Sequence, residues 1–186
     1  MVNFCYNNLG NVFTIGWGIV EKEIIREYTA CFTGHRPEKM GRSEQEVKAL
    51  LNREIDRAVE DGFDTFITGM ARGVDLWAAE LIVERKQKKN YCLICALPYP
   101  GFGSGWDQMA KQSFQMVLEQ ADLVETVHAS YVPYCFQERN IWMVDHSRRV
   151  IAAYNGTKGG TRNTILYAEK QKTEVCNILN GGELIC

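Results

Sequence analysis

The sequence lacks three features that define large classes of proteins: a long apolar run, an excess of basic residues and a regular set of cysteines. The most apolar early run, residues 12–20, is far shorter than the ~20 residues of a membrane-spanning helix. Lys and Arg number 21 against 23 Asp and Glu, a net charge of −2, whereas proteins that bind nucleic acid through bulk charge carry a basic excess. No cation precedes Lys22, as one would in a secretory signal. We expect a cytoplasmic protein without a membrane partner, and the overall charge disfavours nucleic acid as a partner but leaves room for a local basic groove.

The seven cysteines are odd in number and irregularly spaced, unlike the disulfide framework of a secreted protein. Cys92 and Cys95 form a C-x-x-C pair inside the apolar segment 91–97, which is typical of a buried strand. Three residues of strand span ~10 Å and place the two side chains on opposite faces, beyond the reach of a disulfide. We interpret both as small buried hydrophobes.

The 186 residues are about the length of one domain, and 46% of them are hydrophobic. Short apolar runs alternate with amphipathic segments from residue 29 onward. Strands are predicted at 29–33, 63–68, 91–97, 122–127, 150–154 and 174–179, and helices at about 43–62, 74–82, 106–120, 137–147 and 159–171. This alternation predicts a Rossmann-like, three-layer α/β/α fold with a mostly parallel sheet of about six strands. Residues 1–28 do not follow it, and we interpret them as an N-terminal extension of a single domain, 29–186.

Ligands of open parallel sheets bind beyond the carboxyl ends of the strands, so the residues that follow each strand are the candidate site. Glycine, arginine and hydroxyl residues recur there, in the segments 34–37, 69–75 and 155–161. The predicted ligand-binding residues are Gly34, His35, Arg36, Gly69, Arg72, Gly73, Asp75, Asn140, Gly159, Gly160 and Thr161.

The turn Gly159-Gly160-Thr161 has the chemistry of a phosphate site. Glycines let the backbone approach a ligand without a Cβ clash, and the following helix offers unpaired N–H groups and the positive end of its dipole. Thr161 adds a hydroxyl and is a candidate N-cap. The alternative is a tight strand-to-helix turn without a ligand.

Two arginines and a histidine stand in the other loops. The guanidinium groups of Arg36 and Arg72 have the geometry to bind a phosphate or carboxylate. Alternatively, Arg36 forms an ion pair with a nearby acid, and Arg72 is a solvated charge. His35 has no evident nucleophile beside it, so we expect a hydrogen-bonding role rather than a general base.

Other residues near this edge allow two interpretations each. Asp75 lies in a first helical turn, where it either favours the helix dipole or hydrogen-bonds a ribose hydroxyl. Asn140 either approaches the cleft or belongs to a polar helix face. Tyr99, Phe102 and Trp106 either stack on a base or pack as core.

Four motifs occur in order along the chain: GHRP at 34–37, TGMARGVDLWAAE at 68–80, RNIWMVDHS at 139–147 and AAYNGTKGGTRNTILYA at 152–168. Together they resemble the YpsA-like branch of the SLOG superfamily, over about residues 29–179. The resemblance implies a Rossmann-like domain that binds nucleotides or NAD-derived ligands such as ADP-ribose. It also implies a link to cell division and stress in Gram-positive bacteria.

Two relatives of that branch supply alternatives. The DNA-processing protein A family, which binds single-stranded DNA, carries S-G-x-A-x-G-I-D, and residues 68–75 match four of its six specified positions identically. The LOG-type phosphoribohydrolases carry P-G-G-x-G-T-x-x-E. Gly160 and Thr161 align with its G-T pair, but the glutamate position falls on Thr164, which leaves Asp75 or Asp145 as substitutes.

We therefore expect a module that binds or senses a nucleotide-type ligand, NAD-derived or ADP-ribose-like, and favour this over an enzyme. The enzyme alternative is an N-glycosidic hydrolase acting on a nucleoside monophosphate, and the second alternative is a single-stranded DNA-binding protein. No metal site is implied, and a second copy of the chain is a further candidate partner. The interpretation requires Arg36, Arg72 and Thr161 to converge on one anion-accepting rim.

Overall fold

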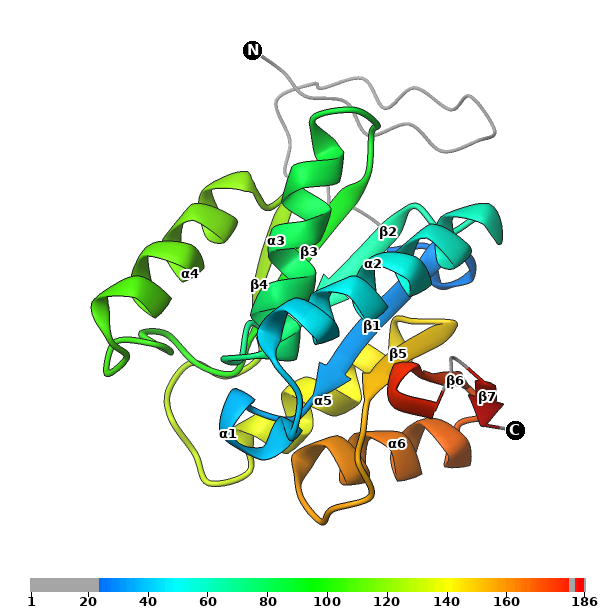
Figure 1. The fold of residues 1–186 in the computed structure, drawn as a ribbon. Coiled ribbons are helices and arrows are strands. Elements are labelled where there is room, and N and C mark those ends of the chain that lie inside the picture. Colours follow the sequence, from blue (N-terminus) through cyan, green and yellow to red (C-terminus); the bar gives the residue numbers. More distant parts are fainter. Residues whose placement is uncertain (1–23, 181–182, 186) are drawn as a thin grey trace.

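The computed structural model describes residues 24–180 and 183–185 (Figure 1). Most of the expected N-terminal extension therefore lies outside the described residues. The strands are β1 (Thr29–Gly34), β2 (Thr65–Thr68), β3 (Cys92–Leu97), β4 (Leu123–Thr126), β5 (Arg149–Ala153), β6 (Glu174–Asn177) and β7 (Glu183–Ile185). The α-helices are α1 (Pro37–Met40), α2 (Glu44–Glu60), α3 (Val74–Lys86), α4 (Gln108–Gln120), α5 (Cys135–Asp145) and α6 (Gly160–Lys170), and 3-10 turns occur at η1 (Arg26–Tyr28) and η2 (Ile178–Asn180).

The strands form one sheet in the order β4-β3-β2-β1-β5-β6-β7. The first six are parallel, and β7 runs antiparallel to β6 at the edge. The chain moves outward from β1 to β4, returns through α5 to β5 on the other side of β1, and continues to β6 and β7. The strand order therefore reverses between β1 and β5, which is where open α/β sheets bind ligands.

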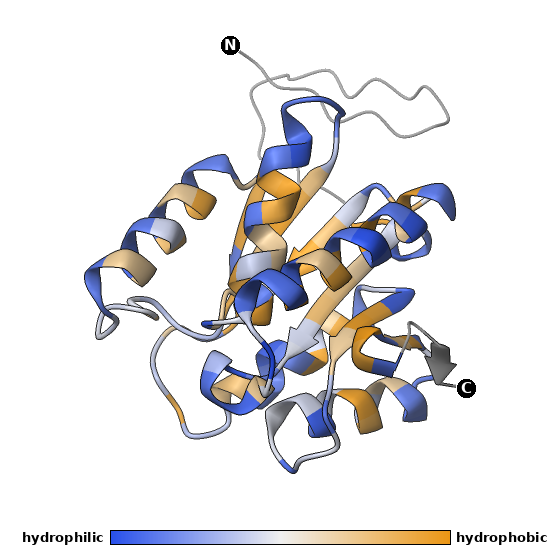
Figure 2. Cartoon of the chain, in the orientation of Figure 1, coloured by the Kyte–Doolittle hydropathy of each residue, from blue (hydrophilic) through white to orange (hydrophobic). Residues whose placement is uncertain are grey.

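Helices cover both faces of the sheet, as the alternating sequence predicts (Figure 1). One apolar cluster packs α2, α3 and α4 against the sheet, and a second packs α5 and α6 against the other face. The central strands are mostly hydrophobic, whereas polar residues lie on the outer surfaces of the helices (Figure 2). Cys95 belongs to the first cluster and Cys92 to the second, which confirms that the two thiols lie on opposite faces.

Helix α2 forms where the sequence predicts it. Its N-cap Ser43 accepts a hydrogen bond from the Glu46 backbone N–H, and the Glu46 side chain accepts one from the Ser43 backbone N–H, a complete capping box. Its buried face includes Val47, Leu51 and Ile55, spaced four residues apart, as one stripe of an amphipathic helix requires.

Two local features differ from the prediction. The loop after β1 contains the short helix α1, which begins at Pro37 and ends at Gly41, whose φ of 68° is left-handed. The last predicted strand, 174–179, ends at Asn177 because its side-chain oxygen accepts the backbone N–H of Leu179 at 3.3 Å and turns the chain into η2. Among the described residues, none of the helices combines the length and apolarity needed to cross a lipid bilayer.

Candidate ligand site at the carboxyl edge of the sheet

The loop after β1 is the centre of the site, because it touches the loops on both sides. Toward β2, a Cβ on Gly73 would lie 2.9 Å from the His35 carbonyl oxygen, so the two loops pack backbone against backbone. Gly73 also has a φ of 92°, which favours glycine. A Cβ on Gly34 would lie 2.7 Å or less from three side-chain carbons of Val74, so β1 ends directly against the start of α3.

Toward β5, the same loop is joined to the loop before α6. The His35 Nε2 lies 3.4 Å from the Thr157 hydroxyl, and its ring lies 5.7 Å from that of Tyr154. The Asn155 side-chain amide donates to the Lys39 carbonyl at 2.7 Å. Burial and the nearby Lys39 lower the pKa of His35, which keeps the imidazole neutral at pH 7. A neutral, buried imidazole fits the expected hydrogen-bonding role.

Gly69, Asp75 and Arg139 form a buried cluster behind the loop after β2. The Arg139 guanidinium donates to the carbonyl oxygens of Gly69 and Ala96, and its Nη1 lies 3.9 Å from the Asp75 carboxylate. That carboxylate accepts the Ala71 backbone N–H at 3.4 Å. Both charged side chains are buried, so Asp75 orients this loop rather than facing an open cleft. Arg139, 64 positions away in sequence, begins the third motif, but its pairing with Asp75 was not predicted.

Burial shifts the pKa values of both charged groups in this cluster. It raises the pKa of Asp75 to about 6, against the opposing effects of Arg139 and the Ala71 N–H. It also lowers the pKa of Arg139. Met70, inside the same turn, has a φ of 57°, an uncommon conformation for a residue with a Cβ. The buried charges and their hydrogen bonds therefore hold the loop in a shape that keeps Met70 in a strained backbone conformation.

The glycine turn before α6 is open toward solvent. A Cβ on Gly159 would meet no atom within 4 Å, and one on Gly160 would touch only the Asn140 amide, at 4.0 Å. Asn140 donates to the Thr164 hydroxyl at 2.9 Å, so α5 is joined to the first turns of α6. The prediction that Thr161 caps α6 is wrong: Gly159 occupies the N-cap position, and Thr161 lies one residue inside the helix, where its side chain is buried.

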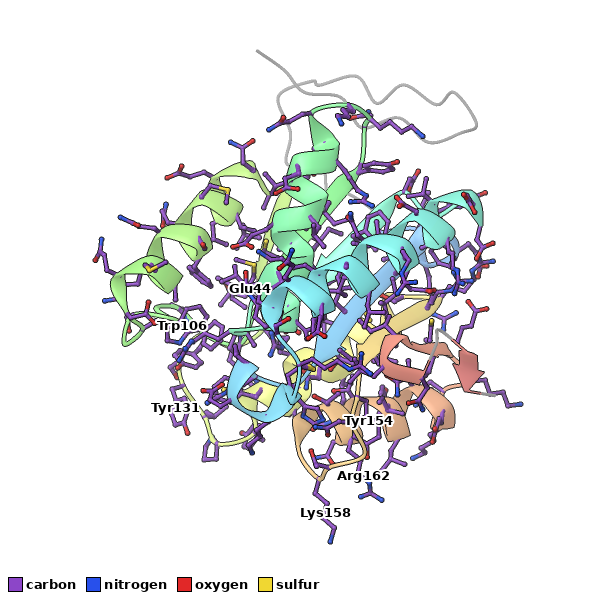
Figure 3. The ribbon with its side chains drawn as sticks, viewed as in Figure 1. Glu44, Trp106, Tyr131, Tyr154, Lys158 and Arg162 are labelled. Atoms are coloured by element: carbon purple, nitrogen blue, oxygen red, sulfur yellow. The ribbon has the colours of Figure 1, made fainter. Side chains whose placement is uncertain are left out.

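The three loops concentrate positive charge. Together with the first turn of the helix that follows each, these loops contain six basic residues against four acids, Glu38, Glu44, Glu46 and the buried Asp75. The basic residues are Arg36, Lys39, Arg42, Arg72, Lys158 and Arg162, and none of them forms a salt bridge with another described residue. Lys158 and Arg162 point outward from their loop (Figure 3). The overall charge of −2 conceals this local excess, so it does not exclude nucleic acid as a partner.

The predicted convergence of Arg36, Arg72 and Thr161 is reproduced by their loops rather than by the three side chains. Arg36 and Arg72 are exposed on loops that touch through His35 and Gly73. Thr161 is buried, and the surface that its turn offers is the backbone of Gly159 and Gly160. The polar groups exposed at this edge are thus the Arg36 and Arg72 side chains and the backbone of the glycine turn.

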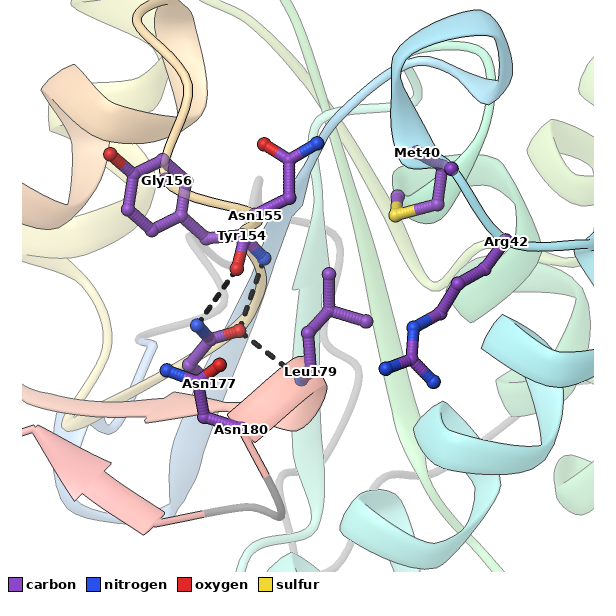
Figure 4. Close-up of a pocket in the computed structure, with 9 residues that line it drawn as sticks. Met40, Arg42, Tyr154, Asn155, Gly156, Asn177, Leu179 and Asn180 are labelled. Carbon is purple, nitrogen blue, oxygen red and sulfur yellow. Dashed lines mark hydrogen bonds between the residues drawn. The ribbon is translucent and has the colours of Figure 1, made fainter.

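A cavity of about 450 Å³ opens beside this rim (Figure 4). It is lined by Met40, Gly41, Arg42, Tyr154, Asn155, Gly156, Asn177, Leu179 and Asn180. Asn177 holds one wall: its side chain accepts the Tyr154 N–H at 3.1 Å and donates to the Tyr154 carbonyl at 2.9 Å. Sequence analysis missed Arg42, because it follows the unpredicted helix α1, and Asn177, because it lies inside the predicted strand 174–179.

Replacing Asn177 with alanine tests this wall. The change removes three hydrogen bonds from a buried position, to Tyr154 and Leu179, and should lower the free energy of unfolding by about 2–3 kcal/mol. Urea unfolding of the variant measures this loss. Asn180→Ala, at an exposed neighbouring position, should change the free energy of unfolding by less than ~0.5 kcal/mol. Equal effects of the two changes would contradict this role of Asn177.

The aromatic residues after β3 pack mainly against one another. Phe102 contacts Tyr99, Trp106, Phe114 and Phe136, with ring centroids 5.2–6.1 Å apart. Tyr131, from the loop after β4, joins the group at 5.3 Å from Tyr99 and remains exposed. Trp106 and Tyr131 lie on the same side of the molecule (Figure 3). The geometry favours packing for Phe102 and Trp106.

Neither Asp75 nor Asp145 is placed to act as the catalytic carboxylate that the LOG-type hydrolase motif supplies through its glutamate. Thr164 is buried, and its hydroxyl donates to the Gly160 carbonyl at 2.9 Å. Asp145 ends α5 and accepts a hydrogen bond from Tyr167 at 2.8 Å, just before β5 begins at the opposite end of the sheet. Asp75 is buried behind its loop.

The open, mostly parallel sheet has helices on both faces, and its strand order reverses between β1 and β5. This architecture is that of a Rossmann-like protein. The profile of the YspA SLOG family matches residues 30–178, so the chain belongs to the YpsA family of SLOG proteins. A UPF0398 protein of Bacillus cereus (strain Q1) is 28% identical over 154 residues, which are 78% of this chain and 84% of that protein.

Solved structures share the fold. DNA processing protein A from Streptococcus pneumoniae superposes with a TM-score of 0.59 at 17% identity, covering 82% of this chain and 50% of that one. DNA processing protein A from Helicobacter pylori, described with a single-stranded DNA binding mode, superposes with a TM-score of 0.54 at 16% identity. The superposition covers 81% of this chain and 64% of that one. The chain thus spans half of the first protein and just under two thirds of the second.

Proposed function

We propose that this protein binds a nucleotide-type ligand through its phosphates at the carboxyl edge of the sheet, as a sensor or binding module. The observation that carries the proposal is the charge of the three loops and the helix turns that follow them: six exposed cations against four acids, one of them buried, in a chain whose net charge is −2. Arginine and backbone N–H groups at a helix N-terminus are the groups that bind phosphate most readily in proteins. NAD-derived molecules such as ADP-ribose are the ligand class that the family resemblance suggests.

The position of these groups supports the same proposal. They surround the point where the strand order reverses, between β1 and β5. The open backbone at Gly159 and Gly160 lets a phosphate approach the first N–H groups of α6. We assign the phosphate to this turn, with Arg36 and Arg72 as charge partners. Gly34, His35, Gly69, Gly73 and Asp75 shape the adjoining loops, and Asn140 supports the turn from α5.

A binding role is favoured over hydrolysis of an N-glycosidic bond. Such hydrolysis needs a carboxylate near the sugar to stabilise a positively charged centre or to activate water. At the aligned position Thr164 uses its hydroxyl within α6. A hydrolase would release adenine from AMP, and this release would be lost in Asp75→Asn.

Binding of single-stranded DNA is the second candidate, because the same cationic rim suits a phosphate backbone and the fold resembles that of DNA processing protein A. If DNA is the ligand, a gel shift with oligo-dT should weaken steeply as salt rises. A nucleotide bound by one or two phosphates should show a shallower salt dependence.

The substitution Gly160→Glu tests the proposed site. A Cβ fits at this position, so the fold should persist while the new carboxylate occupies and repels the phosphate position. ADP-ribose at 100 times its dissociation constant should stabilise the wild type by about 2.7 kcal/mol, and the variant should show no shift in melting temperature.

The control for this experiment is Gln87→Glu, which adds the same charge at an exposed position after α3, at the opposite end of the sheet. Its ligand-induced shift should equal that of the wild type. A normal shift in Gly160→Glu, or no shift with AMP, ADP-ribose and NAD in the wild type, would refute the proposal.

A further inference from the structure

Four aromatic rings lie in a row on the loops that follow β3 and β4. The Tyr99 ring centroid lies 5.3 Å from that of Tyr131 and 5.9 Å from that of Phe102, and the Phe102 centroid lies 5.2 Å from that of Trp106. We propose that this aromatic row docks an uncharged, proline-rich segment of a partner protein. Strands β3 and β4 lie on the opposite side of β1 from β5, so the row is separate from the glycine turn before α6 and docking there does not depend on the phosphate site.

The aromatic row is open to solvent. Tyr131 exposes 59% of its surface, and the other three rings are half-buried. Tyr131 and Trp106 lie on the same side of the molecule (Figure 3). Tyr134 and Met109, which follow the two loops in sequence, are exposed as well, so this region holds three of the seven large hydrophobic side chains that are exposed in the described part of the chain. Tyrosine, tryptophan and methionine are enriched in protein interfaces, and their concentration here indicates a docking surface.

The loops that carry the aromatic row have no acidic or basic residue apart from His128. Residues 98–106 and 127–134 contain no Asp, Glu, Lys or Arg, and the cations of this edge of the sheet stand on the loops after β1, β2 and β5. A single strand of nucleic acid whose bases stacked on the row would need a cationic groove for its phosphates. The lack of charge in these loops therefore favours an uncharged segment of protein over a nucleic acid.

The rings also present hydrogen-bond donors. The hydroxyls of Tyr99 and Tyr131 and the indole N–H of Trp106 have no hydrogen-bond partner among the residues that the structure describes. A proline-rich segment in the polyproline II conformation has no internal hydrogen bonds, and its prolines have no N–H, so it offers carbonyl acceptors and apolar rings. Aromatic-lined grooves bind such segments in other proteins, and the donors and faces of the aromatic row complement the same two groups.

The aromatic row is held in place before any partner binds. Three successive turns, each closed by a backbone hydrogen bond of 3.1–3.3 Å, run from Tyr99 to Trp106. A Cβ on Gly103 would lie 3.5 Å from the Trp106 ring, so this ring packs over the backbone of its own loop. After β4, the His128 Nε2 lies 2.5 Å from the Glu138 carboxylate, which ties that loop to α5. Preformed aromatic surfaces lose little conformational entropy on binding.

Calorimetric titration of the full chain with decaproline, blocked at both ends, tests the proposal. Decaproline should bind with a dissociation constant below about 1 mM, at the weak end of specific affinities. This constant should change by less than about twofold when the salt concentration is raised, because neither surface is charged. A blocked peptide of five Gly-Ser repeats, equal in length and charge but without proline rings, should not bind.

Substitutions of Tyr131 locate the binding. Tyr131→Ala should lower the affinity for decaproline at least about tenfold, as expected for an aromatic anchor. Tyr131→Phe should lower it by a smaller factor, because the ring remains and only the hydroxyl donor is lost. Tyr131 is exposed, so both variants should keep the fold. Tyr167→Ala makes the same change on α6, which packs on the other face of the sheet, and should leave the affinity unchanged.

Several results would overturn the proposal. They are failure of decaproline to bind, equal binding of the Gly-Ser peptide, and full affinity in Tyr131→Ala. Displacement of decaproline by oligo-dT would overturn it in favour of a nucleic acid. A dimer in sedimentation that Tyr131→Ala converts to a monomer would overturn it in favour of a second copy of the chain.

Discussion

Replacing Gly69 with alanine is expected to lower the free energy of unfolding by about 3 kcal/mol or more. A Cβ at this position would overlap the Arg139 guanidinium and lie 2.7 Å from the Asp75 carboxylate. Neither group can move away easily, because both are buried and hydrogen-bonded to the backbone. The methyl group would therefore separate a buried ion pair as well as overpack the core. Urea unfolding measures the loss.

Gly105→Ala is the matched control for this prediction. It makes the same chemical change in the loop before α4, where a Cβ would meet no atom within 4 Å. We expect a change within ~0.5 kcal/mol there. If Gly69→Ala is as stable as Gly105→Ala, the close approach of Arg139 to the β2–α3 loop is not a feature of the folded protein.

The second large effect is a dependence of the free energy of unfolding on pH. Comparison of the wild type with Asp75→Asn isolates the part that Asp75 contributes. Its pKa of about 6 in the folded state lies above the ordinary value of 3.8 because the carboxyl is buried. The folded state therefore binds the proton more tightly than the unfolded state, and the contribution of Asp75 to stability falls as pH rises from 3.8 to 6. At 1.36 kcal/mol per pKa unit, the change is about 3 kcal/mol. The free energy of unfolding of the wild type, relative to Asp75→Asn, should fall by this amount between pH 3.5 and pH 7.5.

Asp107→Asn supplies a control of opposite sign. The Ala110 backbone N–H holds the pKa of the exposed Asp107 below its ordinary value. The contribution of Asp107 to stability is present above the pKa that its carboxyl has in the unfolded state, and it is lost as pH falls. The free energy of unfolding of the wild type, relative to Asp107→Asn, should therefore increase as pH rises. Urea unfolding across the pH range tests both variants. A difference between wild type and Asp75→Asn that is constant with pH would show that Asp75 has an ordinary pKa and is accessible to solvent.

The parallel α/β fold could be predicted because its signals are local. The capping box at Ser43, the four-residue spacing of the apolar face of α2 and the apolar segment of β3 are all properties of short windows. Strand ends also predicted which loops meet, since parallel strands place their carboxyl ends at one edge. The family resemblance rests on the same contiguous motifs, and the match over residues 30–178 confirms it.

The roles of individual site residues could not be predicted in this way. The sequence predicts that Thr161 is the N-cap of α6. Thr161 is instead the second residue of the helix, where its side chain points into the core. The motif at 139–147 does not show that α5 places the Arg139 side chain beneath the turn at Gly69. Asn177 ends its strand through a side-chain hydrogen bond that no hydrophobic pattern encodes.

The amino-acid sequence alone determined the layers, the direction of the strands and the loops that gather at the ligand edge, because periodicity and turn residues act over a few neighbouring positions. Only the tertiary structure decided that Asp75 is buried against Arg139, that the three loops carrying the cations touch one another, and that a cavity opens beside Tyr154. These properties depend on distances between residues far apart in the chain, and burial, charge and pKa follow from those distances.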